Sequence, residues 1–307
     1  MSDTIVLDKV VKVFQEGHHE QILAVDHLTL EIRRGEIFSF VGPDGAGKTT
    51  TIRMMCGVLP ATEGKISIFG YDIRADREEV KKRIGYLSQR FSLYQDLTID
   101  ENLDFFAEIH RIKKFQAQKE ELLQFTRLTE FRDRLAGKLS GGMKQKLALA
   151  CTLIHSPELI LLDEPTTGVD PVSRRDFWKI LSSLLKQGIT IVASTPYLDE
   201  AERSTRVALM NEGRLLQCDT PEQIKNDFPH RVFEIVCRDV HQAVAVLSTL
   251  FKKSELQLFG DRLHLLVTNK SQVDAAVIAM EEHSLPVEHV REITPSLEDV
   301  FIARIQS

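Results

Sequence analysis

The sequence predicts a two-domain α/β protein. Through about the first 220 residues, apolar runs of strand length alternate with segments of helical spacing, and beyond Pro221 the elements follow a βαββαβ order. A chain of 307 residues also exceeds the usual size of one domain. We therefore expect a larger domain over residues 1–222 and a small α+β, ferredoxin-like domain over residues 230–307.

The larger domain should open with short strands separated by polar turns and then alternate buried strands with helices. Its expected strands cover residues 5–7, 10–14, 28–32, 36–41, 65–69, 159–162, 190–194, 207–210 and 214–217. Its expected helices cover residues 48–56, a largely helical region at about 96–155, and residues 173–186. In the smaller domain we expect strands at 232–237, 256–259, 263–267 and 287–292, and helices at 240–251 and 272–283.

The bulk composition narrows the classes of function. Apolar residues make up 43% of the chain and charged residues 27%, which suits a globular protein with a sizeable core. The formal net charge of −6 gives no sign of binding to nucleic acid or acidic lipid. The four cysteines form no C-x-x-C pair and are expected to be reduced core thiols.

No targeting or membrane-spanning segment is expected. The amino terminus is polar and lacks an apolar signal core, and no run approaches the roughly 18 apolar residues of a spanning helix. We expect the chain to work from the water side of any membrane it serves.

A glycine-rich loop between a buried strand and a helix predicts a phosphate site. The loop has the pattern G-x-x-x-x-G-K-T and consists of Gly42, Pro43, Asp44, Gly45, Ala46, Gly47, Lys48 and Thr49, with Thr50 directly after it. Its glycines let backbone N–H groups point at phosphate oxygens, and the following helix adds its positive end. Lys48 would reach the β- and γ-phosphates, and the Thr49 hydroxyl would bind Mg²⁺. An ordinary glycine turn is the alternative, and the strand–loop–helix context argues against it.

Two adjacent carboxylates end a second buried strand. Four apolar residues at 159–162 precede Asp163 and Glu164. Asp163 could hold Mg²⁺ through its water shell, and Glu164 could orient and polarise an attacking water. Strands often end in acids, so this pattern gains its weight from lying downstream of the glycine loop.

A third motif lies shortly before the carboxylates. Ser140, Gly141 and Gly142 open a helix and form an anion-receptive start, although a loop with a capping serine would look similar. With this motif between the glycine loop and the acidic pair, the sequence resembles the ABC ATPase family over about residues 5–220. The resemblance implies a P-loop NTPase fold with an antiparallel β subdomain and a helical subdomain at about 96–155. It also implies ATP and Mg²⁺ as cofactors.

The resemblance assigns further roles. Gln89 matches the glutamine that senses Mg²⁺ and water and faces the membrane partner. The resemblance thus gives Gln89 a catalytic role, as it does Lys48 and Glu164. It also makes Gln89 a metal contact, as it does Thr49 and Asp163. Phe14 matches the aromatic residue that stacks on adenine, although a core phenylalanine is the alternative. Asp170 would communicate across a head-to-tail dimer, homomeric or with a second ABC ATPase. Each ATP there would lie between the glycine loop of one subunit and the Ser140–Gly142 motif of the other.

Closer matching points to the ABC-2 type drug-exporter branch. The segments at 93–98, 139–147 and 294–301 are typical of it, and those at 41–49 and 169–175 look most like the amino-terminal nucleotide domain of YbhF-type exporters. The resemblance implies a separate integral membrane subunit of the ABC-2 type. It also implies a peripheral location on the cytoplasmic side of the inner membrane and export of drugs or other small hydrophobic compounds.

Two positions depart from the family pattern. Pro196 stands where the family has a histidine that contacts the γ-phosphate, and losing one such donor typically lowers the rate by about 10²–10³. The site could hydrolyse slowly with help from Thr195 or Tyr197, could pair with a complete ATPase, or could serve as a clamp that binds ATP. A non-transport ABC ATPase is a further alternative. Asp44 replaces a common asparagine, and its carboxylate should weaken binding slightly unless it turns outward.

Overall fold

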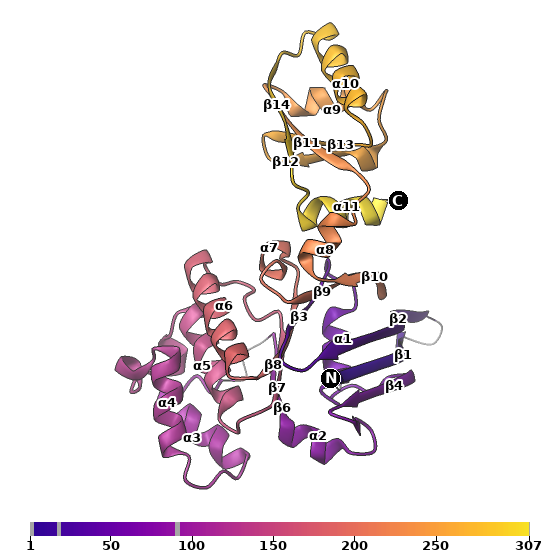
Figure 1. The fold of residues 1–307 in the computed structure, drawn as a ribbon. Helices are drawn as coiled ribbons and strands as arrows, with labels where there is room; N and C mark the ends of the chain where they lie inside the picture. The colour runs from indigo at the N-terminus through magenta and orange to yellow at the C-terminus, as the bar shows by residue number, and fades with distance from the viewer. Residues whose placement is uncertain (1–2, 17–19, 90–92, 307) are drawn as a thin grey trace. The chain divides into compact units, whose positions relative to one another are not determined.

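The computed structural model describes residues 3–16, 20–89 and 93–306. The chain divides into two compact units, Met1–Cys218 and Asp219–Ser307. In the described residues, the first unit contains two sheets and two large hydrophobic cores, and the second contains one sheet with a core of its own (Figure 1).

A six-stranded sheet forms the centre of the first unit. Its strand order is β10-β9-β3-β8-β7-β6, and the neighbours from β9 to β6 are parallel. The strands are β3 (Ile37–Val41), β6 (Ile84–Leu87), β7 (Leu159–Asp163), β8 (Thr190–Thr195), β9 (Arg206–Asn211) and β10 (Arg214–Asp219). The predicted α/β fold is confirmed.

The two faces of this sheet pack into two different cores. Along β7, Leu159 and Leu161 face one core while Ile160 and Leu162 face the other, as the alternation of a strand requires. The first core lies against α1 (Lys48–Met55) and the second against the helices α3 to α6 (Figure 1). Those helices are α3 (Ile99–Ile109), α4 (Gln116–Thr126), α5 (Gly141–Leu153) and α6 (Pro171–Lys186), and the shorter α2 (Arg77–Arg83) precedes β6.

An antiparallel sheet of order β2-β1-β4-β5 completes the first unit. Its strands are β1 (Asp3–Glu16), β2 (Glu20–Arg33), β4 (Glu63–Ile68) and β5 (Tyr71–Asp72). The prediction of several short strands was wrong here, because β1 and β2 are continuous strands of 14 residues each. The register of their pairing shifts near Leu7 and Val10, and Lys9 and His27 adopt positive φ. Such bulges break the apolar alternation without ending the strand.

The second unit is a four-stranded antiparallel sheet of order β12-β13-β11-β14. Its elements are α8 (Pro221–Asn226), β11 (Arg231–Cys237), α9 (Val240–Leu247), β12 (Leu256–Phe259), β13 (Arg262–Val267), α10 (Lys270–Glu282), β14 (Val287–Ile293) and α11 (Leu297–Gln306). From β11 to β14 the order is the predicted βαββαβ. The helices α8 and α11 were not predicted.

The last helix is joined to this sheet by a buried polar contact. Asp299 of α11 is fully buried, and its carboxylate lies 2.7 Å from Nδ1 of His264 on β13. The same side chain accepts hydrogen bonds from the N–H and hydroxyl of Ser296, each over 2.7 Å, at the start of the helix. Burial opposes the charge of Asp299, but the bonds from His264 and Ser296 outweigh it and lower the pKa of this carboxyl.

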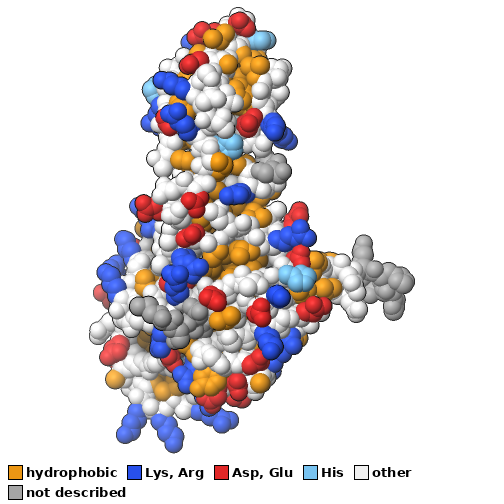
Figure 2. All heavy atoms as spheres, turned by 45° about the vertical axis from the view of Figure 1, so that its right-hand side comes forward, with side chains coloured by type: hydrophobic (Ala, Val, Ile, Leu, Met, Phe, Trp, Pro, Cys, Tyr) orange, Lys and Arg blue, Asp and Glu red, His pale blue; other side chains and the backbone are white. Residues whose placement is uncertain are grey.

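The surface carries mixed charge. Figure 2 shows Lys and Arg side chains interspersed with Asp and Glu over the visible face, without a large region of one sign. Among the described residues, no helix combines the length and apolar character needed to cross a membrane. All four cysteines lie in the described part of the chain and are free thiols.

Candidate nucleotide site

The glycine loop follows β3 and wraps around the start of α1. Gly45 and Gly47 have φ values of 82° and 94°, a region that suits glycine. A Cβ on Gly42 would lie 2.1 Å from the carbonyl oxygen of Met210, and one on Gly47 would lie 2.5 Å from that of Ala24. The sequence therefore needs glycine at these positions both for backbone conformation and for close approach.

Lys48 is buried inside the loop. Its Nζ donates hydrogen bonds to the carbonyl oxygens of Gly42 and Pro43 over 2.7 and 2.8 Å, and it lies 3.9 Å from Glu164 Oε1. Burial lowers the pKa of Lys48, and the nearby carboxylates of Glu164, Asp44 and Asp163 oppose that shift. A cation held among carbonyls is ready to exchange these acceptors for phosphate oxygens.

The two oxygens of Asp163 differ in their surroundings. Oδ1 accepts hydrogen bonds from Thr49 Oγ1 over 2.7 Å and from Ser194 Oγ over 2.8 Å. Oδ2 is buried and has no partner among the described residues. An unpaired buried carboxylate oxygen beside a threonine hydroxyl is a hard-oxygen donor set, which fits Mg²⁺. Asp163 and Thr49 would therefore hold the ion.

Glu164 is fixed at the end of β7. Its N–H donates to Ser194 Oγ over 2.9 Å, and its Oε2 accepts from Gln89 Nε2 over 2.9 Å and from Thr167 Oγ1 over 3.2 Å. Its φ of 46° lies in the left-handed region, which is strained for a residue that is not glycine. The hydrogen bonds hold this backbone conformation and aim the carboxylate at the loop.

Lys48, Thr49, Gln89 and Glu164 line one cavity of about 640 Å³. Residues from six segments line it: Phe14, Ile22, Leu23, Ala24, Asp44, Gly45, Ala46, Gly47, Lys48, Thr49, Thr50, Gln89, Glu164 and Glu212. Phe14 is 38% exposed at the cavity edge, so the alternative of a core phenylalanine is wrong. Asp44 is exposed and also lines the cavity, where its carboxylate acts to raise the pKa of Lys48.

The Ser140–Gly142 motif forms the start of α5 in the first unit. Ser140 is the N-cap, and its hydroxyl accepts from the N–H of Met143 over 3.3 Å. Gly142 is buried so closely against Ser173 that a Cβ would meet its side chain at 2.5 Å. Asp170 caps α6 by accepting from the N–H groups of Val172 and Ser173, and the bonds from Ser173 lower its pKa. Neither Ser140 nor Asp170 lines the cavity of its own chain.

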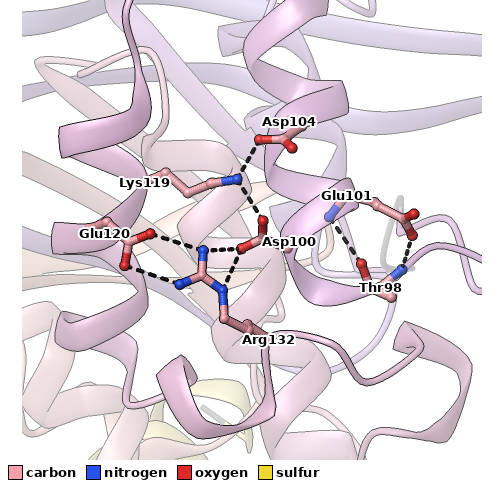
Figure 3. A network of polar contacts seen from close by, with 7 residues as sticks. All are labelled: Thr98, Asp100, Glu101, Asp104, Lys119, Glu120 and Arg132. Carbon is pink, nitrogen blue, oxygen red and sulfur yellow. Dashed lines mark hydrogen bonds and ion pairs between the residues drawn. The ribbon is translucent and has the colours of Figure 1, made fainter.

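A polar network stiffens the helical region that carries Ser140. Figure 3 shows Lys119 between Asp100 and Asp104, and Arg132 between Asp100 and Glu120. Lys119 lies on α4 and its two acids on α3, so the contacts tie these helices together. Backbone bonds then pair residues 95–100 with residues 132–137, just before Ser140. Residues 95–100 are thereby held beside residues 132–137, which lie just before the Ser140–Gly142 motif, called the signature motif below.

The side chains on either side of Pro196 make contacts outside the nucleotide cavity. Thr195 Oγ1 donates to Glu200 Oε2 over 2.9 Å and accepts from the N–H of Tyr197 over 3.0 Å. The Tyr197 ring lies 4.2 Å from the guanidinium of Arg174. Neither Thr195 nor Tyr197 lines the cavity. The idea that one of them substitutes for the missing histidine therefore has no geometric support.

Sequence reasoning missed three residues at this site. Ser194 bridges both carboxylate residues, Thr167 bonds to Glu164, and Glu200 anchors the loops behind them. A serine at the end of an otherwise apolar strand was the available signal for Ser194. Its register partner on β7 is Asp163, which places the two side by side.

Comparison with known proteins agrees with this geometry. Residues 25–167 match the family model for ABC transporters, and residues 220–305 match that for the carboxy-terminal domain of DrrA1-3-like ATP-binding proteins. The chain is 40% identical over 287 residues to the probable multidrug ABC transporter ATP-binding protein YbhF of Escherichia coli, an alignment that covers 91% of the chain and 48% of YbhF. The chain thus spans about half the length of that relative.

Two further comparisons cover whole proteins. The bacitracin transport ATP-binding protein BcrA of Bacillus licheniformis is 34% identical over 284 residues, which covers 92% of each chain. The dimeric, ADP- and phosphate-bound structure of the ATP-binding cassette MJ0796 superposes with a TM-score of 0.64 at 28% identity, covering 70% of this chain and 98% of that one. With the glycine loop, the acidic pair and the signature motif in the places described, this protein belongs to the family of ABC transporter ATP-binding proteins.

Proposed function

We propose that the chain binds and hydrolyses Mg·ATP and so powers export through a separate membrane subunit of the ABC-2 type. The observation that carries the proposal is that Lys48, Thr49 and Glu164 line one cavity, with Asp163 hydrogen-bonded to Thr49. A buried cation, a hard-oxygen donor set and a positioned carboxylate are the parts that phosphoryl transfer to water needs.

Each part has a distinct task in turnover. Lys48 moves from its carbonyl partners to the β- and γ-phosphate oxygens, and the loop N–H groups bind the same oxygens. Thr49 and Asp163 would hold Mg²⁺, which would supply positive charge to neutralise the phosphates. Glu164 orients the attacking water and accepts its proton, while Gln89 and Thr167 keep the carboxylate aimed.

The signature motif supports a two-chain site. Ser140 and Gly141 are exposed at the start of α5, and neither lines the chain's own cavity. A helix N-terminus with an exposed serine is suited to bind the phosphates of a nucleotide held by another copy. The proposed assembly is therefore a head-to-tail dimer, either of two copies or with a second ABC ATPase.

The names of the relatives support a role in the transport of drugs. YbhF is described as a probable multidrug protein, and BcrA as a bacitracin transport protein. We infer by similarity that the cargo is a drug or another small hydrophobic compound. The chain would act as a peripheral subunit on the cytoplasmic side of the inner membrane.

Steady-state hydrolysis of Mg·ATP by the purified chain tests the proposal. We expect turnover that Glu164→Gln abolishes, because the amide cannot accept a proton from water. The exposed Glu130→Gln on the helical region controls for loss of one negative charge. Equal turnover in wild type and Glu164→Gln would refute the role of Glu164. Retention of the chain on washed membranes that carry a co-expressed ABC-2 subunit, and not on membranes without it, tests the partner.

One observation favours a second candidate function. Pro196 supplies no side-chain donor, and Thr195 and Tyr197 are engaged elsewhere. The chain could then be the slow, regulatory half of a mixed dimer with a complete ABC ATPase. Wild-type turnover that stays near the Glu164→Gln blank, despite tight ATP binding, would favour this alternative.

A further inference from the structure

A buried carboxylate behind the nucleotide site joins three segments of the chain. Glu200 of α7 (Leu198–Ala201) is only 2% exposed. Its Oε1 accepts hydrogen bonds from Thr166 Oγ1 over 2.6 Å and from Arg174 Nε over 2.8 Å, and its Oε2 accepts from Thr195 Oγ1 over 2.9 Å. Both oxygens are satisfied, and the guanidinium balances the charge.

Each partner of Glu200 adjoins a residue of the site. Thr166 lies two positions after Glu164, and Thr195 directly follows Ser194, which bonds to both site carboxylates. Arg174 lies in the first turns of α6, just after its cap. The carboxylate of Glu200 thus fixes the end of β7, the end of β8 and the start of α6 to one another.

The turn that contains Pro196 is held from both sides. Thr195 is bonded to Glu200, and its hydroxyl also accepts from the N–H of Tyr197. The Tyr197 ring packs on Arg174, with 4.2 Å between the guanidinium carbon and the ring centre, a favourable cation–π arrangement. A proline restricts the backbone between these two anchors. These contacts and the proline therefore restrict the conformation of the turn at residues 195–197.

A buried ion pair is a poor way to gain stability. Taking both charges out of water costs about as much as their attraction returns, and apolar replacements of similar volume are often as stable. The pair between Glu200 and Arg174, with Arg174 only 20% exposed, therefore points to a geometric role. The geometry it fixes is the distance between the turn at Pro196 and the two carboxylates of the site.

We propose that Glu200 and Arg174 are positioning residues for ATP turnover. They hold residues 194–197 and the start of α6 against Asp163 and Glu164, so the rate of hydrolysis depends on them while the affinity for ATP does not. The inference rests on the proposed ATPase function and adds two residues to it. Neither side chain lines the nucleotide cavity, so both act through the residues that they hold.

Glu200→Gln tests the proposal against Asp199→Asn. Asp199 is the matched control, because it precedes Glu200 and faces the same arginine, but its side chain is 75% exposed and its contacts are 3.4 Å long. We expect kcat to fall about ten- to hundredfold in Glu200→Gln, the range for losing a charge-assisted hydrogen bond. Affinity for a fluorescent ATP analogue should stay within about threefold of wild type. Asp199→Asn should match wild type in both quantities.

Two further measurements keep the test decisive. Thr195→Val removes one hydrogen bond to Glu200 and keeps its ion pair, so it should show a smaller loss of kcat even if Glu200→Gln fails to fold. Hydrogen–deuterium exchange of residues 194–201 in the nucleotide-free chain should quicken in Glu200→Gln and not in Asp199→Asn.

The outcomes separate this inference from the proposed function. Equal kcat in the two acid variants, or an ATP affinity that falls by the same factor as kcat, would overturn the positioning role. A wild type that hydrolyses ATP no faster than Glu164→Gln would overturn the proposed function instead. In that case the exchange measurement decides the inference, and unchanged exchange in Glu200→Gln would refute it.

Discussion

Replacing Ser194 with alanine should impair both the fold and the site. The Ser194 hydroxyl is fully buried, donates to Asp163 over 2.8 Å and accepts from the N–H of Glu164 over 2.9 Å. Alanine removes a hydrogen bond to a charged group and leaves a buried N–H without a partner. Each loss is worth about 1–3 kcal/mol, so we expect the free energy of unfolding to fall by about 2–6 kcal/mol.

The same substitution frees both carboxylate residues. Asp163 Oδ1 would keep only Thr49, and the strained backbone of Glu164 would lose its hydrogen bond. A loss of roughly 1.4–2.7 kcal/mol of this positioning from the transition state corresponds to a fall in kcat of about ten- to hundredfold. Urea unfolding gives the stability change, and steady-state hydrolysis over a range of ATP concentrations gives kcat and KM.

Ser39→Ala is the matched control. Ser39 is also fully buried in the same sheet, on β3, and its hydroxyl lies 2.6 Å from that of Ser204. Its loss should cost about 1–2 kcal/mol of stability, with kcat within about twofold of wild type, because its hydrogen bond does not involve the site carboxylates. If Ser194→Ala lost no more kcat than Ser39→Ala, the claim that Ser194 orients Asp163 and Glu164 would be wrong.

Three further predictions concern other parts of the chain. Pro196→His should raise kcat by up to about 10²-fold in steady-state hydrolysis if the missing donor limits the site, and an unchanged kcat would make the proline neutral. Gly142→Ala should lower the free energy of unfolding in urea by about 1–3 kcal/mol, because the added Cβ meets Ser173. In Gly141→Ala the nearest atom to the added Cβ, the carbonyl oxygen of Gly168, is 3.8 Å away, so stability should change by less than about 1 kcal/mol. Equal losses in the two variants would contradict the packing argument. Burial lowers the pKa of His155 below its unfolded value of about 6.5, so the unfolded chain takes up this proton first and stability is lost as the pH falls below 6.5. The variant His155→Gln cannot be protonated there, so its free energy of unfolding, measured by urea titration, should depend less on pH. An unaltered slope of the free energy of unfolding against pH would refute the assignment.

The sequence predicted the parts of the site that are local in the chain. The glycine loop and the Asp163–Glu164 pair each follow a buried strand, so their neighbours in sequence already define their surroundings. Parallel strands also bring their carboxyl ends to one edge of a sheet, which is why motifs from distant segments could be expected to meet.

The remainder of the site depends on tertiary contacts. Glu200 acquires its role only because Thr166 and Arg174, each more than 20 positions away, fold against it. Ser194 matters through its register with Asp163 across two strands. The predicted elements were wrong chiefly where bulges preserve a strand without alternation, in β1 and β2, and the prediction omitted the helices α8 and α11.

The contact between Asp299 and His264 gives the segment Thr294–Phe301 a physical meaning. That segment resembles a family signature, and its buried acid is bonded to residues of the second unit. The Asp299–His264 contact holds α11 against the sheet of the second unit. If a relative keeps the four strands but lacks this contact, we expect the apolar side chains of Val232 and Leu266, which pack against Ala303, to become exposed. For a relative truncated before this helix, the expected defect is therefore aggregation through the exposed apolar surface, and not a loss of ATPase activity.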